Sequence, residues 1–138
     1  MNSQGSRPLS VVVVDDEPDV ALYLAAVLEK KGHEAHIAGS AAEGFALVKD
    51  LHPDVACLDI VMPEETGLAL LRRIRADREV GETAVVFISA LKPEMAGPQS
   101  GPDAETLLEP DEYVEKPPNS ETFVAAVERA ARSRRARR

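Results

Sequence analysis

The chain has 138 residues, of which 44% are hydrophobic and 29% charged, and its formal net charge is −8. This length and composition fit one globular domain and exclude a collagen, a coiled coil or a wholly disordered protein. No apolar run approaches the ~20 residues that a membrane-spanning helix needs, and the N-terminus lacks the pattern of a secretory signal. The single cysteine, Cys57, cannot form an internal disulfide, which fits a reducing compartment. We therefore expect a cytoplasmic protein without a membrane segment.

The charge is unevenly distributed along the chain. Residues 1–128 carry 10 basic and 24 acidic side chains, a net charge of −14, whereas the last ten residues carry six arginines and no acid. An acidic body makes direct binding of nucleic acid an unfavoured interpretation. We expect residues 133–138 to form a solvated basic tail, with contact to an acidic partner or a phosphate backbone as the alternative. Residues 1–7 are expected to be flexible, which leaves a domain over residues 8–132.

Short runs of apolar and β-branched residues alternate with segments of helical periodicity. The expected strands span residues 9–14, 35–38, 55–58, 84–88 and 113–114, and the expected helices span 18–31, 41–51, 67–77 and 119 or 120 to about 132. Four of the strands are apolar at consecutive positions, which is typical of a parallel sheet buried on both faces. Five β/α units in a row predict an α/β fold with helices on both sides of the sheet.

Residues 91–112 interrupt this alternation. They contain four of the ten prolines and two glycines. A proline inside a helix costs about 3 kcal/mol, so a continuous helix cannot run through this segment. We expect at most a short helix over residues 103–108, and therefore an atypical fourth helix region.

Polar residues follow four of the expected strands, at Asp15, Asp16, Asp59, Ser89 and Lys116. The carboxyl ends of parallel strands meet at one edge of the sheet, so these side chains are expected to lie together. Three clustered carboxylates repel one another, and a bound divalent cation relieves that repulsion. Oxygen ligands without imidazole or thiol favour Mg²⁺. The sequence therefore predicts a magnesium site at this edge.

Each of these residues also has an ordinary structural interpretation. An aspartate pair after a strand often forms a turn, a serine at a strand end is often a turn hydroxyl, and a lysine is usually solvated. Their joint placement at four strand ends favours a site. The histidines, His33, His36 and His52, show no metal-ligand spacing, and we expect them on the surface.

The chain resembles a response-regulator receiver domain of two-component signalling, from Leu9 to about Arg132. The matching motifs are VVVVDDEP (11–18), DVACLDIVMP (54–63) with Gly67-Leu68, VVFISA (85–90) and DEYVEKP (111–117). The resemblance implies a flavodoxin-like, doubly wound (βα)5 fold with the strand order 2-1-3-4-5.

The resemblance also implies roles for the residues at the sheet edge. Asp59 would accept a phosphoryl group from a histidine kinase or a histidine phosphotransfer protein. Asp15, Asp16, Asp59 and the backbone carbonyl of Val61 would hold the Mg²⁺ ion.

Three further residues are implied to bind and report the phosphoryl group. Ser89 and Lys116 would contact it, and Tyr113 would move with Ser89 as a switch. The Lys116–Pro117 peptide bond would be cis. Partner binding would change as a result, toward a downstream protein, an output domain or a second copy in a homodimer.

We expect no enzyme activity beyond weak self-phosphorylation and self-dephosphorylation. Two alternatives stay open: a degenerate receiver that acts as a constitutive scaffold, and a Mg²⁺-dependent phosphatase of the haloacid dehalogenase type with an aspartate nucleophile. The complete set of strand-end residues is evidence against the scaffold. Ile60 and Val61 follow Asp59 without the second aspartate that such a phosphatase uses.

Overall fold

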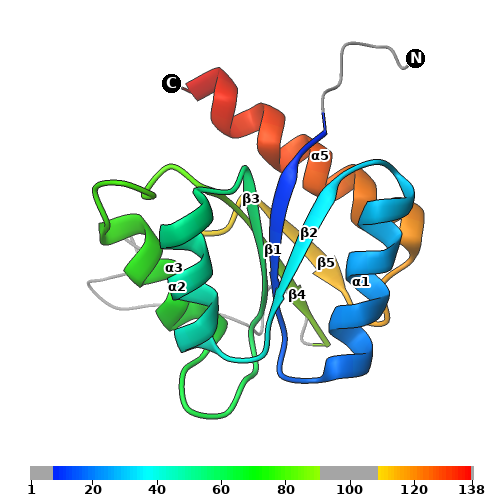
Figure 1. Ribbon diagram of the computed structural model, residues 1–138, viewed down its shortest axis with the longest axis horizontal. Helices are drawn as coiled ribbons and strands as arrows, with labels where there is room; N and C mark the ends of the chain where they lie inside the picture. The colour runs from blue at the N-terminus through cyan, green and yellow to red at the C-terminus, as the bar shows by residue number, and fades with distance from the viewer. Residues whose placement is uncertain (1–7, 91–108, 138) are drawn as a thin grey trace.

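The computed structural model describes residues 8–90 and 109–137. Within these ranges the elements are β1 (Ser10–Val14), α1 (Pro18–Lys30), β2 (Glu34–Ala38), α2 (Ala41–Leu51), β3 (Val55–Asp59), α3 (Gly67–Ala76), β4 (Ala84–Ser89), β5 (Glu112–Glu115) and α5 (Ser120–Arg137). The strands form one parallel sheet in the order β2-β1-β3-β4-β5 (Figure 1). The expected α/β class and strand order are confirmed.

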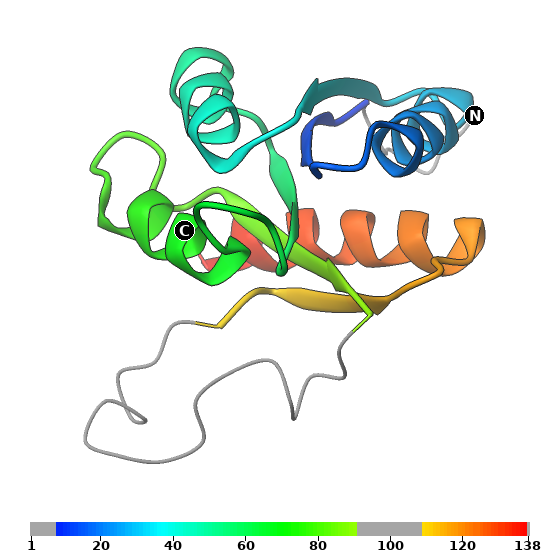
Figure 2. The same cartoon turned by 90° about the horizontal axis from the view of Figure 1, so that it is seen from below.

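Helices cover both faces of the sheet. Helices α1 and α5 pack on one face, and α2 and α3 pack on the other (Figure 1). Figure 2 shows α5 running alongside the sheet next to β4 and β5. The consecutive valines of β1 explain the two layers, because Val11 and Val13 join the core under α1 and α5 whereas Val12 and Val14 join the other core. Each such buried side chain contributes about 1.5–3 kcal/mol relative to an exposed one.

Local sequence fixes where the helices begin. Ser40 Oγ accepts a hydrogen bond from the N–H of Glu43 at 3.1 Å, as expected for the start of α2. The Glu43 carboxylate accepts a hydrogen bond from the N–H of Gly39 at 2.8 Å. In a capping box it would accept from the N–H of the N-cap residue itself, Ser40. Asn119 caps α5, which begins at Ser120, by accepting two backbone N–H groups.

The expectation that all three histidines lie on the surface is wrong for His33, which is 8% exposed. Its Nδ1 accepts the N–H of Leu9 at 3.0 Å, and its Nε2 lies 3.0 Å from Oε2 of Glu128. Because Nδ1 accepts, the neutral ring carries its proton on Nε2 and donates it to the carboxylate. His33 thereby joins the start of β1 to α5. His52 is exposed and His36 is half-buried.

Helix α5 continues past its expected end at Arg132. Arg134 is 13% exposed, and it donates from Nε to Oδ1 of Asp111 and from Nη1 to Oε1 of Glu82, both at 3.0 Å. Arg134 is therefore not solvated, contrary to the expectation for residues 133–138. The acidic body itself provides partners for part of the basic segment.

Two expectations lie outside the described residues. They are the flexible N-terminus over residues 1–7 and the greater part of the atypical fourth helix region, residues 91–108. The domain limits at residues 8 and 132 stay a prediction. In the described ranges, no helix is both long enough and apolar enough to cross a membrane.

Candidate functional site

Asp59 is the last residue of β3, and its side chain is only 6% exposed. The loop that follows it turns back at Gly67, whose N–H donates to the carbonyl oxygen of Ile60 at 2.9 Å. A Cβ atom at position 67 would overlap the carbonyl oxygen of Asp59 and would lie 3.0 Å from the Cα of Ile60. Glycine thus lets α3 begin directly against the end of the strand that carries Asp59.

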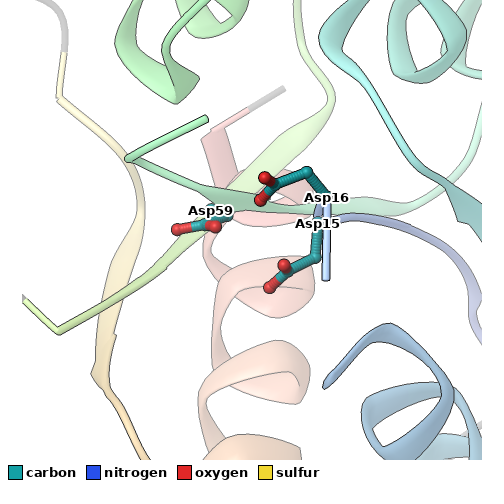
Figure 3. A group of neighbouring side chains, drawn as sticks. All are labelled: Asp15, Asp16 and Asp59. Atoms are coloured by element: carbon teal, nitrogen blue, oxygen red, sulfur yellow. The ribbon is translucent and has the colours of Figure 1, made fainter. Parts of the chain in front are cut away.

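Three carboxylates reach the same space from the ends of β1 and β3 (Figure 3). One oxygen from each of Asp15, Asp16 and Asp59 lies within 4.8 Å of those of the other two. Asp15 is buried and accepts the N–H of Glu17 through Oδ1 at 2.9 Å. Its other oxygen, Oδ2, is also buried and has the Lys116 ammonium as its near cationic neighbour, 3.2 Å away. A buried carboxylate oxygen of this kind, beside two more carboxylates, fits a bound hard cation.

Lys116 supplies the positive charge at this edge. Its Nζ lies 3.2 Å from Oδ2 of Asp15 and 3.5 Å from Oδ2 of Asp59. The backbone N–H of Lys116 donates to the carbonyl oxygen of Ser89 at 2.9 Å, and the Lys116–Pro117 peptide bond is cis. Burial lowers the pKa of the Lys116 ammonium, but Asp59 and Asp15 together raise it by more. The net result is a pKa above the usual value for a lysine.

The pKa of Asp59 is raised to about 6. Burial of the carboxyl group is the largest cause, followed by repulsion from Asp15, while Lys116 and the N–H of Val61 act in the opposite direction. The Val61 N–H donates to Oδ1 of Asp59 at 3.3 Å. Lys116 and the Val61 N–H thus do not fully offset the effects of burial and of Asp15, and a bound divalent cation would lower the pKa of Asp59 further.

A surface depression lies over these carboxylates. It is lined by Asp16, Glu17, Asp59, Val61, Ser89, Ala90 and Lys116. Ser89 is buried at the end of β4, whereas the side chain of Val61 is exposed. The depression brings together residues from the ends of β1, β3, β4 and β5, as the sequence predicts for their location. It is open to solvent, whereas the Asp59 side chain at its base is only 6% exposed.

Tyr113 lies on β5 beside Phe87 of β4, to which it is paired in register. The two rings meet edge to face with their centroids 5.7 Å apart, and Tyr113 is 39% exposed. Burial and the charge of Glu109 raise the pKa of the Tyr113 hydroxyl. The ring is thus held on one side by Phe87, and its movement with Ser89 stays a prediction.

The residues present can hold a divalent cation through carboxylates. The ligand atoms of Asp15, Asp16 and Asp59 are all oxygens, and they lie close enough to share one ion. The Val61 carbonyl as a further ligand stays a prediction. Glu17 belongs to the motif after β1, and its side chain also reaches Lys116, a contact that the sequence does not predict.

In the absence of Mg²⁺, Asp59→Asn should raise the free energy of unfolding at pH 7–8 by about 1–2 kcal/mol. The carboxyl pKa is about 6 in the folded protein and 3.8 in the reference state, so its contribution to stability is present below pH ~4 and is lost as the pH rises through about 6. The variant avoids that loss. The full pKa shift of Asp59 would correspond to a larger difference in the free energy of unfolding, but water at the open side of the site screens the charge.

Urea unfolding of both proteins in chelator between pH 4 and 8 measures this difference. It should shrink toward zero near pH 4, and added Mg²⁺ should stabilise the wild-type protein more than the variant. A difference that does not change with pH would contradict the assigned cause.

The model of the response regulator receiver domain family matches residues 11–128. Protein PilH of Pseudomonas aeruginosa is 30% identical over 120 residues, which cover 85% of this chain and 93% of PilH. The DNA-binding response regulator MtrA of Mycolicibacterium smegmatis is 31% identical over 117 residues, which cover 85% of this chain but only 48% of MtrA. The chain therefore belongs to the receiver domain family of response regulators, and it spans about half the length of relatives such as MtrA.

Solved structures agree with this assignment. A sensor protein from Polaromonas sp. JS666 superimposes with a TM-score of 0.81 at 25% identity, covering 94% of this chain and 99% of that one. NtrX from Brucella abortus superimposes with a TM-score of 0.79 at 27% identity, covering 95% of this chain and 28% of NtrX. The chain is thus similar both to a protein of about its own length and to one part of a much longer protein.

Proposed function

We propose that this receiver domain accepts a phosphoryl group on Asp59 from a histidine kinase or a histidine phosphotransfer protein, with Mg²⁺ held by Asp15, Asp16 and Asp59. The observation that carries the proposal is the cluster of three carboxylates beside the Lys116 ammonium, in a depression at the carboxyl edge of the sheet. Membership of the receiver family supports it.

The residues of the site suit transfer of a phosphoryl group to a carboxylate. A carboxylate oxygen of Asp59 attacks phosphorus, the bond between phosphorus and the donor's histidine nitrogen breaks, and its electron pair returns to the imidazole. The incoming group and Asp59 are both anionic, and Lys116 is placed to neutralise part of that charge. A bound Mg²⁺ would supply the remaining positive charge. The protein provides positioning and electrostatics, while the donor supplies the reactive bond.

Phosphorylation adds about 1.5–2 negative charges at the edge of the sheet. We expect Ser89 and Lys116 to bind the phosphoryl oxygens, and the Tyr113 ring on β5 to change its position as a result. We expect this change to alter the binding of a downstream protein, an output domain or a second copy of the chain. MtrA is a DNA-binding regulator, but the acidic body of this receiver argues against direct contact with DNA.

The two alternatives have less support. A constitutive scaffold has no need for Lys116 to lie within ion-pair distance of Asp59, and the chain retains that contact. A phosphatase of the haloacid dehalogenase type would need a second acidic residue two positions after Asp59, where Val61 stands. We propose no enzyme activity beyond weak self-phosphorylation and self-dephosphorylation.

The test is incubation of the chain with a small acyl phosphate donor and Mg²⁺, followed by intact mass spectrometry. One phosphoryl group should be added, stable in acid and labile in base, and peptide mapping should place it on Asp59. Removal of the metal with a chelator should suppress the reaction. Uptake that is independent of metal, or uptake on another residue, would contradict the proposal.

A further inference from the structure

The Lys116 ammonium lies beside a third carboxylate, that of Glu17. Lys116 Nζ is 3.6 Å from Oε1 of Glu17, nearly the same distance as from Asp59 at 3.5 Å. Glu17 occupies the N-cap position of α1, but its side chain makes no capping hydrogen bond. Its carboxylate is therefore not used to stabilise its own helix. Of the three carboxylates around Lys116, Asp15 and Asp59 belong to the proposed metal ligands and Glu17 does not.

We infer that Glu17 is a positioning residue, which holds the Lys116 ammonium when Asp15 and Asp59 bind a divalent cation. The inference rests on the proposed function. Lys116 lies 3.2 and 3.5 Å from oxygens of the two carboxylates, so a cation on those oxygens repels it. Lys116 then needs another anion within reach. In the described ranges, Glu17 is the carboxylate in ion-pair contact with Lys116 that remains available.

The exposure of Glu17 suits a temporary partner. Its side chain is 63% exposed, whereas that of Lys116 is 17% exposed. An ion pair with one partner largely in water is weak and is screened by salt. Lys116 can therefore leave Glu17 for a phosphoryl group on Asp59, whose added charge attracts the ammonium more strongly. Glu17 would favour entry of the metal without retaining Lys116 afterwards.

The affinity of the unphosphorylated chain for Mg²⁺ tests this role, measured by calorimetry or by NMR titration. Glu17→Gln should weaken Mg²⁺ binding about fivefold, because Lys116 then stays with Asp15 and Asp59. Asp19→Asn is the matched control, since Asp19 is an exposed acid in the same first turn of α1. It removes the same charge without contact to Lys116, and its effect should be less than about twofold.

Two further variants separate contact from charge. Glu17→Asp keeps the charge but shortens the side chain by one methylene group, so it should resemble Glu17→Gln. In a Lys116→Met background, Glu17→Gln should weaken binding no more than Asp19→Asn does, because the ammonium that Glu17 holds is absent.

Each outcome decides between the two proposals. Equal Mg²⁺ affinities for Glu17→Gln and Asp19→Asn, or a Glu17→Gln effect that persists without Lys116, would overturn the role of Glu17 and leave the proposed function intact. The expected pattern of Mg²⁺ affinities together with a failure of phosphorylation would overturn the proposed function alone. Absence of Mg²⁺ binding to the wild-type chain would overturn both.

Discussion

Asp59→Asn is expected to abolish uptake of a phosphoryl group from a small donor in the presence of Mg²⁺. The amide oxygen is a poor nucleophile compared with a carboxylate, and the variant also removes one charge from the proposed metal ligands. The substitution preserves the shape of the side chain, and its Oδ1 can still accept the N–H of Val61. The variant is expected to be more stable than the wild-type protein in the absence of Mg²⁺, and urea unfolding under the assay conditions would show that loss of uptake does not come from unfolding.

Asp50→Asn provides the matched control for this experiment. Asp50 is an exposed acid on α2 and does not line the depression that contains the proposed acceptor, so the change removes the same charge outside the site. The control should be phosphorylated like the wild-type chain at the same Mg²⁺ concentration, as intact mass spectrometry would show. Equal uptake by Asp59→Asn and the control would move the acceptor to another residue.

The sequence was sufficient for the architecture because the signals that determine it are local. Consecutive apolar residues such as Val11–Val14 can only be buried if helices cover both faces of the sheet, and the alternation of elements then implies a parallel order. The candidate site follows from the same logic. Once the strands are parallel, residues at or directly after their carboxyl ends, such as Asp59 and Lys116, must share one edge.

The features that the sequence did not predict depend on partners that are distant along the chain. His33 is buried because it bonds Leu9, 24 positions away, and Glu128, 95 positions away. Arg134 is largely covered, and its partners are the buried Asp111, 23 positions away, and Glu82, 52 positions away. Periodicity and capping rules describe neighbours within a turn or a strand, so they contain no information about such pairs. The contact of Glu17 with Lys116 is of the same kind.

A buried ion cluster lies at the start of β5, the strand that leads to Lys116. The cluster is therefore at the opposite end of this strand from the site. The Asp111 side chain is 3% exposed and accepts from Nη2 of Arg75 at 3.2 Å, Nε of Arg134 at 3.0 Å and the N–H of Val85 at 2.8 Å. One carboxylate thus links α3, α5 and β4 to the start of β5. Opening this cluster should affect the whole domain.

Asp111→Asn should lower the free energy of unfolding by about 2–4 kcal/mol. The substitution removes the anion shared by two guanidinium groups that are only 10% and 13% exposed, while an acceptor for Val85 can remain. The neighbouring Glu112→Gln is the control, because Glu112 pairs with Arg129 of α5 at 2.9 Å but that arginine is 51% exposed. An exposed pair contributes at most about 1 kcal/mol. Urea unfolding at neutral pH measures both losses, and equal losses would mean that burial does not strengthen the Asp111 cluster.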